Sequence, residues 1–153
     1  MKVLVVGASG GVARNVVSLL AERGHEPVAV VRKQEQEEQL RQLGASDVVI
    51  ADLEEDISHI FTDQDAVIFA AGSGGKTGGD KTILVDMWGA MKVIDGAVVN
   101  GIERFIMLSS IGTVNPDKSE RIRHYLVAKK NSGRLFKAIK AQLYDRAPGH
   151  VDE

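Results

Sequence analysis

Short hydrophobic runs alternate along this chain with longer segments in which apolar residues recur at helical spacing. The runs are rich in valine, isoleucine, leucine and alanine, which is typical of strands that a parallel sheet buries on both faces. Strands are predicted at Lys2–Val6, Pro27–Val31, Asp47–Ile50, Ala66–Ala70 and Arg104–Leu108. Helices are predicted at Gly10–Arg23, Lys33–Leu43, Asp80–Asn100 and Glu120–Lys130. This alternation predicts a single α/β domain, a Rossmann-like doubly wound parallel sheet with helices on both faces.

The composition narrows the classes of partner and chemistry. The net charge is −2 and the isoelectric point about 6.1, values that do not suggest a nucleic acid or an anionic membrane as a partner. The absence of cysteine excludes disulfides and thiolate metal sites, and the four histidines are too scattered to predict a metal site. No apolar run approaches the roughly 20 residues that span a bilayer, and the first run stops at Gly7, too early for a signal peptide. We therefore expect a cytoplasmic protein, and no motif in the sequence sets its oligomeric state.

The most informative motif is Gly7-Ala-Ser-Gly-Gly-Val-Ala13, a glycine turn between the first predicted strand and the first predicted helix. In a dinucleotide-binding unit, this order of elements places a pyrophosphate on the helix N-terminus. Gly7 would allow the sharp exit from the strand, Gly10 the approach of the backbone to the phosphates, and Ala13 close packing of helix on strand. We expect cofactor contacts from the turn residues Gly7, Ser9, Gly10, Gly11 and Val12. A purely structural turn is the alternative interpretation.

The residues that follow the second and third predicted strands bear on the choice of cofactor. NAD-binding units commonly place an acidic residue at the end of the second strand, whereas this chain has Arg32 and Lys33 there. Two cations favour the 2′-phosphate of NADP over NAD, although they would also suit the solvated start of a charged helix. Asp52, followed by Leu53, is placed to accept a hydrogen bond from the adenine amino group. The alternative for Asp52 is a helix cap.

A second set of residues predicts chemistry at the other end of such a cofactor. Ser110 follows the fifth predicted strand, at the edge of the sheet where doubly wound proteins bind ligands. Tyr125 and Lys129 are four residues apart on a predicted helix and therefore share a face. An ammonium beside a phenol is expected to lower the phenol pKa from about 10, which would make Tyr125 a usable general acid–base. Lys129 would also reach the nicotinamide ribose, and Ser110 would hydrogen-bond the substrate oxygen. Tyr and Lys at this spacing also occur by chance, so the set predicts catalysis only together with the glycine turn.

Together these motifs resemble an atypical short-chain dehydrogenase/reductase, of the NAD(P)-binding branch that includes NmrA-like and sugar-epimerase-like proteins. The stretches that carry the resemblance are Gly7–Ala13, Val30–Arg32, Ala51–Leu53, Ala66–Gly75, Phe105–Gly112 and His124–Lys130. The resemblance implies NADP bound through the first turn, Arg32, Asp52 and the loop formed by Ala70, Ala71 and Gly72. It implies hydride transfer to or from a small carbonyl or alcohol.

The matching stretch of the long helix departs from classical relatives, which add an Asn there to the Ser-Tyr-Lys set. This chain offers Asp86 instead, as the atypical branch does, and an ionised carboxylate cannot donate the proton that an Asn amide supplies. A non-catalytic NADP(H) sensor is therefore the alternative function. Such a protein would keep the glycine turn and Arg32 without needing Tyr125.

Two further stretches need an interpretation. Ala70–Thr77 matches a loosened P-loop, but Gly78 and Gly79 follow where a P-loop would be helical, so a nucleoside triphosphatase is a remote alternative to a glycine-rich loop over the cofactor.

In the tail, Asn131-Ser-Gly133 is expected to break the last helix, with no sixth strand after it. Suitable codons for 131–149, read one base later, can spell a helix, a turn and an apolar strand ending in Arg-Pro-Gly. We therefore expect a frame alteration over 131–150, and we expect the chain to lack the substrate-binding segment of its relatives.

Overall fold

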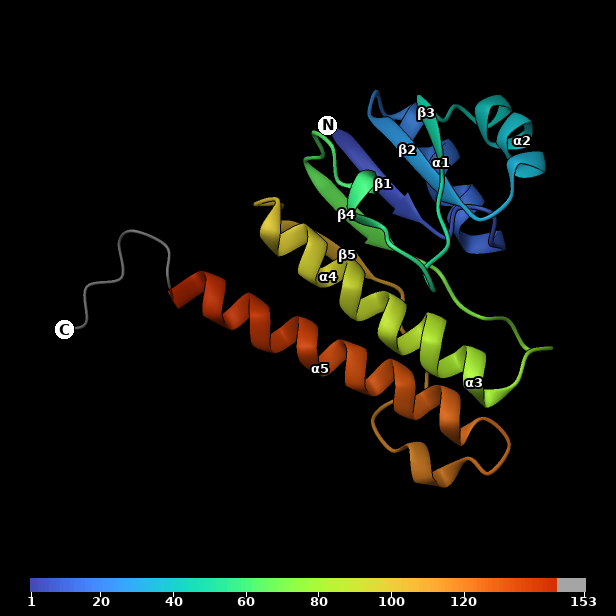
Figure 1. The fold of residues 1–153 in the computed structure, drawn as a ribbon, viewed down its shortest axis with the longest axis vertical. Coiled ribbons are helices and arrows are strands. Elements are labelled where there is room, and N and C mark those ends of the chain that lie inside the picture. Colours follow the sequence, from blue (N-terminus) through green and yellow to red (C-terminus); the bar gives the residue numbers. More distant parts are fainter. Residues whose placement is uncertain (146–153) are drawn as a thin grey trace.

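The computed structural model describes residues 1–145 of the chain, with side chains for residues 1–138. Five parallel strands form one sheet in the order β3-β2-β1-β4-β5 (Figure 1). The strands are β1 Lys2–Val6, β2 Glu26–Val31, β3 Asp47–Ile50, β4 Ala66–Phe69 and β5 Arg104–Met107. The prediction of a doubly wound parallel sheet is confirmed.

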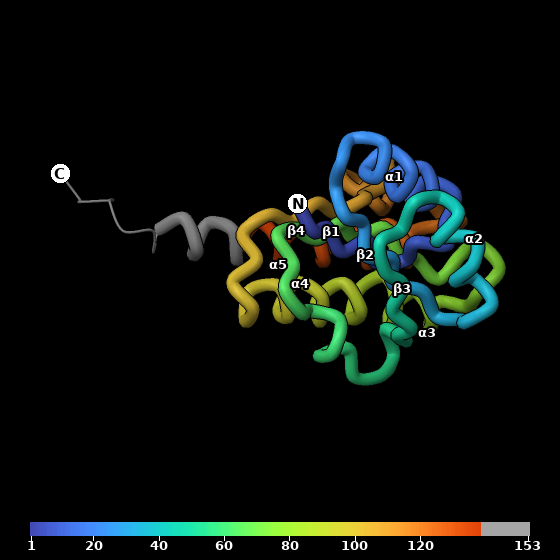
Figure 2. The backbone as a smooth tube through the Cα atoms, turned by 90° about the horizontal axis from the view of Figure 1, so that it is seen from above, coloured from blue at the N-terminus to red at the C-terminus, as the bar shows by residue number. Residues whose placement is uncertain are grey.

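The helices connect the strands across both faces of this sheet. They are α1 Gly11–Glu22, α2 Glu37–Gln42, α3 Gly79–Lys81, α4 Ala90–Val99 and α5 Arg123–Asp145. Short 3₁₀ turns lie at Gln34–Gln36, Ser58–Ile60 and Pro116–Lys118. A π-helical segment, Thr82–Gly89, joins α3 to α4, so the long helix predicted at 80–100 has a wider turn in its first half. Figure 2 shows α1 and α4 on opposite sides of the sheet.

Alternation along the strands divides the core between the two faces. Val3 and Val5 of β1 pack with Ala13 and Val17 of α1. The neighbouring residues Leu4 and Val6 point the other way and join the core that α4 closes. On that second face α5 runs beside the π-helical segment and α4 (Figure 1). The Phe136 ring of α5 lies 5.2 Å from the ring of Phe105 on β5.

The predicted break of the last helix at Asn131-Ser-Gly133 is wrong. Helix α5 continues through these residues to Asp145, well beyond the predicted end at Lys130. The Ser132 side chain is fully buried, and its hydroxyl donates to the carbonyl oxygens of Ala128 (2.9 Å) and Asp86 (3.1 Å). This contact with the π-helical segment offsets the poor helix propensity of Gly133. Of the stretch for which a frame alteration is predicted, residues 146–150 lie outside the described part of the chain. The frame alteration stays a prediction.

Candidate functional site

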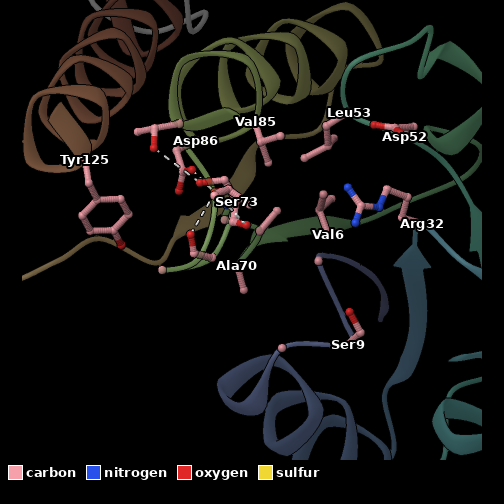
Figure 3. A pocket seen from close by; sticks show the side chains of 18 of the residues that line it. Val6, Ser9, Arg32, Asp52, Leu53, Ala70, Ser73, Val85, Asp86 and Tyr125 are labelled. Carbon is pink, nitrogen blue, oxygen red and sulfur yellow. Dashed lines mark hydrogen bonds between the residues drawn. The ribbon is translucent and has the colours of Figure 1, made fainter. Parts of the chain in front are cut away.

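A cavity of about 1000 Å³ opens at the carboxyl ends of the strands. The strand order places β1 between β2 and β4, which makes this the point where the chain crosses from one half of the sheet to the other. Ligands of doubly wound proteins bind at such a crossing. Figure 3 shows Arg32 and Asp52 at one end of the cavity and Tyr125 at the other.

The glycine turn forms part of the cavity wall. Gly7 has φ of +81°, and its N–H and that of Ala8 both donate to the carbonyl of Val30 on β2, at 3.1 and 3.0 Å. A side chain at Gly7 would collide with the backbone of Ala71, which follows β4. Glycine is therefore required by both backbone angle and space. The turn ends at Gly10, where α1 begins with no acidic residue in its first turn.

The turn residues do not all reach the cavity. Gly7, Ser9 and Gly10 line it, whereas Gly11 and Val12 belong to the first turn of α1 and are not lining residues. The Val12 side chain is instead exposed to solvent. Backbone N–H groups at a helix N-terminus still present partial positive charge toward the turn, which is the arrangement that binds phosphate.

The residues expected around the adenosine part line the opposite wall. Arg32 and Lys33 follow β2 with exposed side chains, and Asp52 and Leu53 follow β3. Asp52 Oδ1 accepts the Glu54 N–H at 2.9 Å, so the carboxylate caps a turn as well as lining the cavity. The two interpretations of Asp52 are therefore compatible.

The loop after β4 supplies the floor of the cavity. Ala70, Ala71 and Gly72, which are the positions predicted to contact the cofactor, all line it. The Thr77 hydroxyl donates to the carbonyls of Ser73 (3.2 Å) and Gly74 (2.9 Å), and Lys76 is not a lining residue. This arrangement does not support the P-loop alternative, which needs Lys76 and Thr77 turned toward a triphosphate.

Asp86 lies on the inner side of this floor, at the centre of a cluster of buried polar atoms. Its side chain is 0% exposed, and its Oδ2 accepts the Ser73 N–H at 2.9 Å. Its Oδ1 lies 3.6 Å from Lys129 Nζ, an ion pair too long for a hydrogen bond. A Cβ at Gly72 would lie 3.0 Å from the same Oδ1, so the loop passes close to the carboxylate.

Lys129 is turned toward Asp86 and away from the cavity. Its side chain is 4% exposed and its Nζ donates to the Ala71 carbonyl at 3.1 Å. The same Nζ lies 5.8 Å from the centre of the Tyr125 ring. Burial lowers the pKa of Lys129, and the negative charge of Asp86 opposes that change. Lys129 is not a lining residue, so the predicted approach to a nicotinamide ribose is not met in this arrangement.

Of the predicted catalytic set, Tyr125 and Asp86 line the cavity, and Figure 3 shows the Tyr125 ring at one end of it. Burial raises its pKa, the charge of Asp86 raises it further, and an interaction with the Ser110 hydroxyl opposes the rise. The prediction that the Tyr125 pKa is lowered beside Lys129 is therefore wrong, because burial of the phenol and then the negative charge of Asp86 raise it. Ser110 adjoins the phenol but is not a lining residue, and its hydroxyl also donates to the Ile111 carbonyl at 3.3 Å.

Sequence reasoning missed several residues that line the cavity. They are Val6, Val30, Val31, Gln36, Ala51, Thr82, Val85, Ser119, Arg121, Ile122 and His124. Arg121 and His124 could have been predicted from their closeness to Tyr125 in the sequence, since they precede it by four residues and by one.

Among the described residues, no group of three or more His, Asp or Glu side chains is placed to hold a metal ion. In the same part of the chain, no helix is long and apolar enough to cross a membrane.

Comparison with known proteins gives consistent relatives. The NAD(P)H-binding family matches residues 7–143. An uncharacterised sugar epimerase of Bacillus subtilis is 43% identical over 143 residues, which cover 90% of this chain and 66% of the relative. A UPF0659 protein of Saccharomyces cerevisiae is 34% identical over 99% of this chain and 70% of its own length. The solved structure of a putative NAD-dependent epimerase/dehydratase from Bacillus halodurans is 59% identical with a TM-score of 0.88, covering 90% of this chain and 64% of that one.

The chain thus spans about two thirds of the length of the relatives that it matches. The family match extends over most of the chain and includes both the glycine turn and the Tyr125–Lys129 helix. The protein therefore belongs to the NAD(P)H-binding family of atypical, epimerase-like short-chain dehydrogenases/reductases.

Proposed function

We propose that this protein binds NADP(H) in the cavity and transfers hydride to or from a small carbonyl or alcohol. The proposal rests on one observation, which is that three features line the same cavity. These are the Gly7–Gly10 turn, the Arg32–Lys33 pair at one end and the Tyr125 phenol at the other. The two ends suit the 2′-phosphate and the nicotinamide of such a cofactor, and the turn suits the pyrophosphate that joins its two halves.

The residues present fit a dinucleotide phosphate. The turn is free of side chains at Gly7 and Gly10, and the α1 N-terminus adds N–H groups with no acidic residue to repel an anion. Arg32 and Lys33 offer two exposed cations for a 2′-phosphate, and Asp52 beside them suits the adenine amino group. The name of the Bacillus halodurans relative specifies NAD, so the preference for NADP rests on the two cations of this chain.

When held by the Gly7–Gly10 turn, Arg32 and Lys33, NADPH would supply a hydride for the carbonyl carbon in the reducing direction. Tyr125 donates its phenolic proton to the carbonyl oxygen, which becomes the alcohol. A pKa raised by burial and by Asp86 keeps this phenol protonated at neutral pH, which favours its role as the acid. The Ser110 hydroxyl, beside the phenol, orients the substrate oxygen.

Lys129 and Asp86 act on this step from below. The Lys129 Nζ lies 5.8 Å from the Tyr125 ring centre, and its hydrogen bond to the Ala71 carbonyl holds the loop after β4 beside that ring. Asp86 holds Lys129 in place and ties the Ser73 backbone to the floor of the cavity. A non-catalytic NADP(H) sensor is the second candidate, and it is favoured by one observation: Lys129 points away from the cavity, toward Asp86 and Ala71.

The test is NADPH oxidation with a panel of small aldehydes and ketones by the parent protein and Tyr125→Phe. We expect turnover in the parent, a loss of about 10²-fold or more in Tyr125→Phe, and equal NADPH affinity in both proteins. Ring and burial are kept in the variant, so its loss of turnover would reflect the missing proton. Turnover that survives the change would rule out Tyr125 as the acid. NADPH binding without turnover in the parent would favour the sensor.

A further inference from the structure

The end of the cavity beside Tyr125 carries two side chains to which the proposed function gives no role. Arg121 and His124 line this end together with Ser119 and Ile122. The Leu126 N–H donates to the Ile122 carbonyl at 3.0 Å, so the helical turn that begins α5 reaches back to Ile122. Arg121 directly precedes this turn, four residues before the tyrosine in the sequence.

These two side chains offer hydrogen-bond donors at the Tyr125 end of the cavity. The carboxylates that line the cavity belong to Asp52 and Asp86. Asp52 lies at the far end, beside Arg32, and Asp86 is buried against Lys129 (Figure 3). Neither carboxylate is therefore available to neutralise a cation near Tyr125.

The neighbouring Arg123 differs from Arg121, because it already has an acidic partner. Arg123 Nη2 pairs with Asp117 Oδ1 at 2.6 Å and does not line the cavity. Within residues 1–138, by contrast, the Arg121 guanidinium forms no ion pair. The His124 ring also approaches the opposite wall, since its Cδ2 would lie 3.8 Å from a Cβ at Gly79, the first residue of α3.

We propose that the substrate of this protein carries an anionic group, a phosphate or a carboxylate, that Arg121 and His124 bind. The guanidinium matches the planar pair of oxygens that both groups present, and the imidazole adds a donor from the next turn of the chain. Because both side chains line the same cavity as Tyr125, the anion would lie in the same pocket as the reacting carbonyl of the substrate. This inference rests on the proposed function, because it names the class of molecule that Tyr125 would protonate.

The experiment reads anion binding directly and does not need turnover. Protein saturated with NADP is titrated with inorganic phosphate, with acetate and with uncharged acetamide, while backbone amide shifts are followed by NMR. We expect saturable shifts at Ser119–Tyr125 with phosphate or acetate and none with acetamide. The anion that binds more tightly tells a phosphate-bearing substrate from a carboxylate-bearing one.

Three variants assign the binding. Arg121→Gln is expected to weaken the anion about tenfold, and His124→Gln to weaken it by a smaller factor. Arg123→Gln, on the same turn but outside the cavity, is the matched control and should leave the affinity unchanged. Equal affinities in the Arg121 and Arg123 variants, or shifts with acetamide as large as those with the anions, would overturn the inference.

Cofactor binding is measured first and separately, by NADPH fluorescence. Failure of the parent to bind NADPH would contradict the proposed function. The amide shifts locate the anion by residue, so the Arg121 result can also be read from the same titration of cofactor-free protein. A variant Arg121→Gln that loses NADPH affinity but keeps anion affinity would place the guanidinium on the cofactor and would also overturn the inference.

Discussion

Asp86 and Lys129 form an ion pair that is almost completely enclosed beneath the floor of the cavity. Their side chains are 0% and 4% exposed, and Oδ1 lies 3.6 Å from Nζ. Each group also has a backbone partner, the Ser73 N–H for Asp86 and the Ala71 carbonyl for Lys129. The pair therefore links three elements that lie beside the cavity. These are the π-helical segment, α5 and the loop after β4.

Removing one member of this pair should destabilise the protein strongly. Lys129→Met would leave the Asp86 charge buried without its cation, a change that costs about 3–5 kcal/mol at comparable sites. Asp86→Asn would leave the ammonium alone at a similar cost. The double variant should be markedly more stable than the sum of the two losses implies. Urea denaturation of the four proteins checks this, and additive losses would show that the pair is not coupled.

The titration of Tyr125 should respond to Asp86. The carboxylate raises the phenol pKa, so Asp86→Asn should lower that pKa relative to the parent. The measurement is the ultraviolet absorbance of the phenolate across alkaline pH, with Tyr125→Phe used to subtract the second tyrosine, Tyr144. Asp52→Asn is the matched control, because that acid lies at the other end of the cavity. A Tyr125 pKa unchanged in Asp86→Asn would contradict the electrostatic account.

The glycine turn can be tested against another glycine with similar backbone angles. Gly7 and Gly24 have φ of +81° and +74°, but a Cβ at Gly7 collides with Ala71 whereas a Cβ at Gly24 meets nothing within 4 Å. Gly24→Ala should cost about 1 kcal/mol of unfolding free energy and leave NADPH binding intact. Gly7→Ala should cost more and should abolish NADPH binding. Equal effects of the two changes would remove the argument that Gly7 shapes the cavity.

The continuity of α5 predicts a stabilising change. Gly133 lies inside the helix, and a Cβ there meets nothing within 4 Å. Gly133→Ala should therefore raise the free energy of unfolding by roughly 1 kcal/mol, the difference in helix propensity. Gly101→Ala serves as a contrast, because Gly101 has φ of +68° and should lose stability on the same change. A destabilising Gly133→Ala would indicate that the helix does end near Asn131.

The features that the sequence alone predicts well are those fixed by short-range patterns. The bounds of β1 and β3 agree with prediction because apolar runs between turn residues define them, and the Gly7 turn follows from local backbone demands. The end of α5 could not be predicted, because Ser132 is held by a hydrogen bond to Asp86, 46 residues away. The π-helical segment likewise depends on packing: a Cβ at Gly89 would lie 3.0 Å from the Leu53 side chain.

The same distinction applies to the candidate site. The i,i+4 spacing of Tyr125 and Lys129 correctly places both on one helix, but it does not tell which buried group the ammonium faces. That group is Asp86, and its charge adds to the burial of the phenol in raising the Tyr125 pKa, against the expected direction. Long-range electrostatics of this kind appears only once the π-helical segment and α5 are packed together.

The central claim is that the cavity binds NADP(H) through Arg32, and a fluorescence titration tests it most directly. NADPH and NADH are titrated into the parent, Arg32→Gln and, as a surface control, Arg23→Gln. We predict that the parent binds NADPH about tenfold or more tightly than NADH, and that Arg32→Gln loses most of this preference while Arg23→Gln keeps it. Equal affinities for the two cofactors in the parent, tighter NADH binding, or no binding of either would contradict the account.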